Sequence, residues 1–171
     1  GMDTTQIVTI DKKGDIVLGK DKSTGAFYIW FKVRNDKVDL PSLIDTALFD
    51  MFASLNPDTV DSVKITESRS RDDLDVLYVL KRFGADLGIP QKCMHLRTTL
   101  QRGPGRVTAS GRAIPYSSSP NQSLSPIKDC LSETVFSWAD PHEMKVTYMF
   151  QGTVHERLPA YMANIMGLLM K

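Results

Sequence analysis

Alternating apolar and polar side chains predict a series of β-strands. The clearest is Ala26–Arg34, where one set of alternate side chains is apolar and the other set mixes aromatic residues with cations. Lys92–Leu100 and Arg106–Ile114 predict a hairpin, because the Gly-Pro-Gly sequence between them favours a tight turn. Shorter runs of strand character occur at Gln6–Ile10, Ile16–Leu18, Val60–Glu67, Thr134–Trp138 and Lys145–Gln151.

Three other segments repeat apolar residues every three or four positions, which predicts helices. The first begins at Asp39 and ends near Leu55. The second begins at Ser70, in a sequence that resembles a capping box, and runs to about Phe83. The third runs from about Pro159 to the end of the chain and is rich in methionine, a residue that adapts to irregular partners. For this third helix we expect packing in the core; alternatively, it lines a ligand cavity or forms a homodimer interface.

The predicted order is three strands, a helix, a strand, a helix, four strands and a helix. This order favours an α+β fold, with a mixed, mainly antiparallel sheet and about three helices packed on it. We expect a single domain over residues 2–171 and exclude Gly1, which is typical of a cleaved tag. Residues 116–126 are rich in serine and proline, so they predict a flexible surface loop.

The composition is that of an ordinary globular protein, with 42% hydrophobic and 24% charged residues and a net charge of +1. No apolar stretch approaches the ~18 residues of a membrane span, so we expect a cytoplasmic protein with no membrane partner. The only cysteines, Cys93 and Cys130, are too few for a disulfide framework and are typical of small buried side chains.

The charge is unevenly distributed along this nearly neutral chain. No acidic residue lies between Asp86 and Asp129, whereas that interval contains six cations. Arginine binds phosphate and carboxylate well, and the turn glycines allow backbone N–H groups to approach an anion. The candidate ligand-binding residues on this predicted hairpin are Arg97, Arg102, Arg106, Arg112 and His95. Alternatively, these cations form a solvated face or pair with acidic residues elsewhere in the chain.

From these features we expect a non-catalytic binding or regulatory domain that engages an anionic ligand or a partner protein through the basic hairpin. Binding to nucleic acid is not expected, because Tyr116 is the only aromatic residue close to the arginines.

A small enzyme is the alternative hypothesis, in which His95 and an acidic residue near 140–143 perform general acid–base chemistry. The sequence has no metal-binding spacing of histidines or cysteines, no nucleophile elbow and no glycine-rich nucleotide loop. We therefore expect no cofactor and no metal, and whether the protein is an enzyme stays open at this point.

Overall fold

The computed structural model describes residues 7–45, 60–82, 85–88, 90–117 and 123–152. These residues form one sheet in the order β1-β2-β3-β10-β9-β7-β6-β5-β4, in which all these neighbours are antiparallel. The short strand β8 pairs with β6 in parallel. The strands are β1 (Ile7–Lys13), β2 (Ile16–Asp21), β3 (Phe27–Arg34), β4 (Val60–Ser70), β5 (Asp73–Leu80), β6 (Gln91–Gly103), β7 (Arg106–Ala113), β8 (Leu124–Pro126), β9 (Leu131–Asp140) and β10 (Glu143–Gln151).

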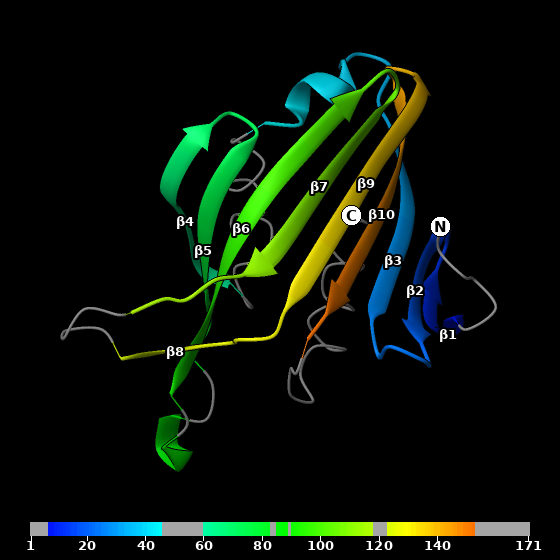
Figure 1. Cartoon of the computed structure of the whole chain (residues 1–171). Helices are drawn as coiled ribbons and strands as arrows, with labels where there is room; N and C mark the ends of the chain where they lie inside the picture. Colours follow the sequence, from blue (N-terminus) through cyan, green and yellow to red (C-terminus); the bar gives the residue numbers. More distant parts are fainter. Residues whose placement is uncertain (1–6, 46–59, 83–84, 89, 118–122, 153–171) are drawn as a thin grey trace.

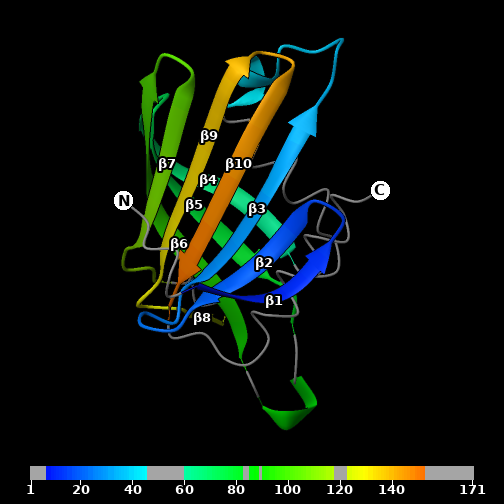
Figure 2. The same ribbon diagram turned by 90° about the vertical axis from the view of Figure 1, so that its right-hand side faces the viewer.

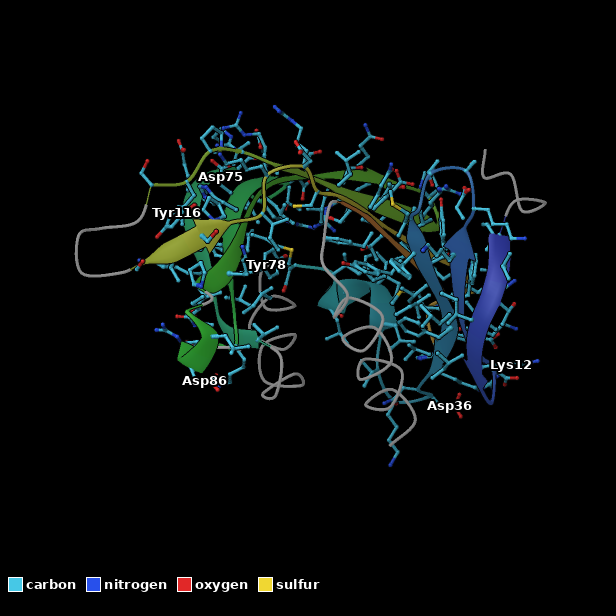
Figure 3. All side chains as sticks on the ribbon, turned by 90° about the horizontal axis from the view of Figure 1, so that it is seen from below. Lys12, Asp36, Asp75, Tyr78, Asp86 and Tyr116 are labelled. Carbon is cyan, nitrogen blue, oxygen red and sulfur yellow. The ribbon has the colours of Figure 1, made fainter. Side chains whose placement is uncertain are left out.

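The sheet is strongly curved, so that β1 and β2 on one arm face β4 and β5 on the other (Figures 1 and 2). Seen from below, it arches over an inner, concave face (Figure 3). Alternation along each strand divides the side chains between the two faces. On β3, Ile29 and Phe31 point to the concave face, whereas Trp30 and Lys32 point to the outer, convex face.

Two of the three apolar clusters that the described residues form lie on the concave face. The first joins both arms of the sheet, because Ile16, Leu18 and Ile29 pack in one cluster with Met94 and Leu96. The second lies at the other end of the arch and includes two residues from the segment that carries the 3-10 turn η2 (Leu40–Leu43). Its buried members are Leu40, Ile44, Val107, Met144 and Val146.

The third cluster lies on the convex face of β5 and β6. Leu77, Val79 and Cys93 are buried there against Tyr116 and Leu124, which belong to the connection between β7 and β9. Strand β5 is therefore covered by apolar side chains on both of its faces.

The predicted α+β fold is wrong for the described residues, which form a mainly antiparallel sheet with two short 3-10 turns, η2 and η3 (Ala85–Leu87). The predicted helix from Ser70 to Phe83 is the end of β4, a tight turn and strand β5. Both faces of β5 are buried, so its apolar residues are nearly continuous along the sequence. A continuous apolar run matches the spacing expected of a helix as well as that expected of a strand.

The two other predicted helices lie largely outside the described residues. Of the segment from Asp39 to Leu55, the structure describes η2 and the residues up to Asp45. The methionine-rich segment from Pro159 onward, with its predicted homodimer contact, lies wholly outside them. The predicted hairpin at Lys92–Ile114 is confirmed, and its turn contains Gly105 at a φ of 68°.

Candidate functional site

The concave face is an apolar surface to which most of the described strands contribute. The concave side chains of β6, β7, β9 and β10 are uncharged along the middle of each strand. Many large side chains on this face are only partly buried, although they pack against the two clusters. They include Phe27, Phe31, Tyr78, Leu80, Leu100, Phe136, Trp138 and Tyr148.

A strip of small side chains runs along the middle of this face. On β7, Ala109, Gly111 and Ala113 alternate with residues of the convex face. Opposite them on β9 are Ser132 and Thr134. Large residues on β6 and β10 flank this strip. The side chains at the centre of the concave face are therefore smaller than those on its two sides.

Two tyrosines of the described strands direct their phenolic hydroxyls toward this face, and no other tyrosine of these strands does so. Tyr78 comes from β5 and Tyr148 from β10, and Figure 3 shows Tyr78 on the inner side of the sheet. Burial raises the pKa of both phenols, and the phenolate of Tyr148 would raise the pKa of Tyr78 further. Both hydroxyls therefore stay neutral and can donate or accept a hydrogen bond at physiological pH.

The segment that contains η2 packs against one end of the concave face. Arg102 bridges two elements there: its Nε donates to Asp72 Oδ1 at 2.8 Å, and its guanidinium donates to the carbonyl oxygen of Ile44 at 2.9 Å. His142 Nδ1 lies 2.9 Å from the carbonyl oxygen of Val38. These bonds hold the 35–45 segment against the turns of the neighbouring hairpins.

The basic hairpin does not bring its four arginines into one groove. Arg102 pairs with Val107 and therefore lies on the concave side of the hairpin. Arg97 and Arg112 lie directly opposite each other on the convex face. Arg106 is also convex but six residues further along β7, which corresponds to about 20 Å. The exposed cations Arg106 and Arg112 remain candidates for ligand binding, and that role stays a prediction.

Arg97 is paired within the chain, as the alternative interpretation of the basic segment expected. Its Nε donates to Asp75 Oδ1 at 3.2 Å, and Arg69 donates to both oxygens of the same carboxylate, at 2.6 and 3.1 Å. Asp75 is only 3% exposed. These hydrogen bonds, above all those from Arg69, hold the pKa of Asp75 well below its usual range.

His95 lies on the convex face and holds the connection between β7 and β9. Its Nδ1 is 3.1 Å from the carbonyl oxygen of Pro115, its Nε2 is 2.7 Å from Thr66 Oγ1, and its ring meets the ring of Tyr116 edge to face.

The proposed partners at 140–143 lie at the other end of the sheet. Gly103 on β6 lies in the same row of the sheet as Arg106 on β7 and Ser137 on β9, close to that turn. His95 comes eight residues before Gly103 on β6, so it lies about 26 Å from this row along the strands. The acid–base pair of the enzyme hypothesis is therefore not formed.

The sequence patterns did not predict the concave face as a site. The available signal was the small side chains at alternate positions of β7, which lie on the same strand as two of the candidate arginines. Within the described residues there is no group of three or more histidine, cysteine or acidic side chains that could hold a metal ion. The same part of the chain contains no helix of the length and hydropathy needed to span a bilayer.

Comparison with solved structures identifies the fold of this chain. The structure is similar to human StAR-related lipid transfer protein 5, with a TM-score of 0.69 and 10% identity over 98% of this chain and 86% of that one. A fragment of the STAR-related lipid transfer protein from Xanthomonas axonopodis gives 0.68 and 13% identity, over 95% and 90% of the two chains. The lipid transfer and protein localization domain of human StarD13 gives 0.61 and 16% identity, over 96% and 83%.

The chain therefore has the fold of StAR-related lipid transfer domains. At these identities the likeness shows the fold alone. No protein-family model and no curated protein matches the sequence.

Proposed function

We propose that this protein is a non-catalytic domain that binds a lipid-type ligand against the concave face of its sheet. The observation that carries the proposal is the apolar concave face, whose large side chains are only partly buried and whose centre is lined by small ones. Burial of apolar surface contributes about 25 cal/mol per Å², so an apolar ligand that covers these side chains gains affinity from each of them. The three similar structures, all named for lipid transfer, support the same function.

The chemistry of the face also restricts the polar part of the ligand. Along the middle of the described strands no charged side chain on this face can compensate a buried carboxylate or phosphate, and burying an unpaired charge is costly. The hydroxyl of Tyr148 makes no hydrogen bond to any described residue. It is therefore suited to a neutral hydroxyl or carbonyl group of the ligand. We infer a ligand with an apolar body and a small uncharged polar group.

The experiment uses two neighbouring positions of β7 that point to opposite faces. Ala109→Trp fills the strip of small side chains on the concave face, whereas Ser110→Trp adds the same side chain on the exposed convex face. The probes are dehydroergosterol and a phosphatidylcholine with a fluorescent acyl chain, each offered from phosphatidylcholine vesicles. The readout is the change in probe fluorescence on transfer to the full chain.

We expect saturable binding of at least one probe, weakened about tenfold or more by Ala109→Trp and changed by less than about twofold by Ser110→Trp. Thermal melting of both variants checks that they fold. If neither probe binds, or if both folded variants bind as tightly as the parent protein, the concave face is not a lipid site.

A further inference from the structure

A pocket lies on the convex face, to which Trp30, Lys32, Lys145 and Thr147 direct their side chains, whereas Phe31 and Val146 in its lining direct theirs to the concave face. Its volume is about 460 Å³, within the range of about 300–1,000 Å³ that is typical of small-molecule sites. It lies over β3 and β10 beside the turn between β1 and β2. The lining residues are Asp15, Trp30, Phe31, Lys32, Lys145, Val146 and Thr147.

An aromatic surface forms one side of this pocket. Trp30 stacks on Tyr28 with ring centroids 5.5 Å apart and planes 10° from parallel. Gly19 on β2 gives the tryptophan its room, because a Cβ atom there would lie 3.0 Å from the Trp30 ring and 2.8 Å from Ile7. The indole ring is therefore held in place by packing, and a planar ligand can stack against it without further ordering of the protein.

Two lysines form the other side. Lys32 and Lys145 lie directly opposite each other on β3 and β10, an arrangement that is unfavourable for like charges. Glu143 lies 3.7 Å from Lys32 but is also bound to Arg34 at 3.2 Å. No ion pair to Lys145 is formed by any described residue.

The positive charge continues along the same row of the sheet. Lys145 pairs with Ser137, and Ser137 pairs with Arg106, so a third cation lies two strands away from the lysine pair. Arg106 is one of the four arginines of the basic hairpin. An anion between the lysines would relieve their repulsion and would lie within the field of this arginine.

We propose that this pocket binds a phosphorylated ring compound of the nucleoside monophosphate class. The ring stacks on Trp30, and the phosphate lies between Lys32 and Lys145. The carboxylate of Asp15, which also lines the pocket, accepts hydrogen bonds from ligand hydroxyl groups. Charge on the lysines and a fixed aromatic ring together favour this class over a free ring or a free phosphate, each of which would use only half of the pocket.

The test follows the fluorescence of Trp30 in a Trp138→Phe background, where Trp30 is the only tryptophan of the chain. Adenosine monophosphate, adenosine and inorganic phosphate are titrated separately in buffer of low ionic strength. We expect saturable quenching by adenosine monophosphate, with binding by adenosine or phosphate weaker by about tenfold or more.

Lys145→Gln and Lys64→Gln provide the matched pair of variants. Lys64 is also an exposed lysine on a strand, but it lies on β4 at the far edge of the sheet. We expect Lys145→Gln to weaken the nucleotide about tenfold and Lys64→Gln to leave it unchanged. Absence of quenching, equal binding of adenosine and its monophosphate, or equal effects of the two lysine variants would each overturn the proposal.

Discussion

Replacing Asp75 with asparagine tests the main electrostatic contact of the sheet. The side chain of Asp75 is buried on the outer side of β5, where it accepts three hydrogen bonds from Arg69 and Arg97 (Figure 3). The Asp75→Asn variant keeps the shape of the side chain but removes its charge. Two guanidinium groups then lose the carboxylate that they share, and the amide of asparagine cannot accept all three bonds in the same way.

The expected loss follows from the burial of the three groups. Breaking a fully buried ion pair costs about 3–5 kcal/mol, because the remaining charge is uncompensated. Here the side chains of Arg69 and Arg97 are 30% and 39% exposed, so water compensates part of the loss. We therefore expect Asp75→Asn to lower the free energy of unfolding by about 2–3 kcal/mol, or the melting temperature by about 4–12 °C for a domain of this size.

The assay is urea unfolding of both proteins between pH 7 and pH 2. Because the folded state lowers the pKa of Asp75, its contribution is complete above the unfolded value of about 3.9 and is lost as the pH falls below it. The difference between parent and variant should thus be constant from pH 7 to pH 5 and shrink toward pH 2. Asp61→Asn is the control, since Asp61 forms an exposed ion pair with Lys81. A loss no larger than that of Asp61→Asn, or one that does not depend on pH, would refute the reasoning.

Two further predictions concern the hairpin turn and the cysteines. Gly105→Ala should cost about 1–2 kcal/mol more in urea unfolding than Gly25→Ala, since both glycines have positive φ but only at Gly105 would a Cβ atom meet a backbone oxygen, that of Trp138 at 2.7 Å. Equal losses would contradict this steric argument. Burial raises the pKa of the Cys130 thiol to about 11, so at pH 8 we expect Ellman's reagent to react with it only after denaturant is added. Fast reaction of the folded chain would show that this thiol is accessible.

Period-2 patterns in the sequence predicted most strands, because those strands have one apolar face and one polar face. Ala26–Arg34 is the clearest case, and β3 covers nearly the same residues. Strand β5 was missed because both of its faces are buried, and the face that breaks the alternation is covered by Tyr116 and Leu124 from a distant segment. A contact of that kind depends on the tertiary fold and leaves no periodic signal in β5 itself.

The candidate site shows the same limit for charged residues. The sequence identifies a basic interval, but the partner of Arg97 is Asp75, which lies on the neighbouring strand β5 in the segment predicted as a helix. Once β5 is read as a strand, that pairing follows from the register. The concave face could not be found earlier for a related reason. A strip of alanine and glycine on β7 is significant only when the larger residues of β6 and β10 are known to flank it.

Strand β10 carries side chains of both proposed sites, so it allows the two to be tested against each other. Tyr148 belongs to the concave face and Lys145 to the convex pocket, three residues away on the same strand. Tyr148→Phe removes one hydroxyl from the lipid site, and we expect it to weaken the lipid probe by about 1 kcal/mol, or about fivefold, without affecting nucleotide quenching. Lys145→Gln should have the opposite pattern. Tyr148 and Lys145 point to opposite faces of the strand, so each variant should weaken only the ligand of its own face. If either variant weakens both ligands equally, the two faces of β10 do not form independent sites.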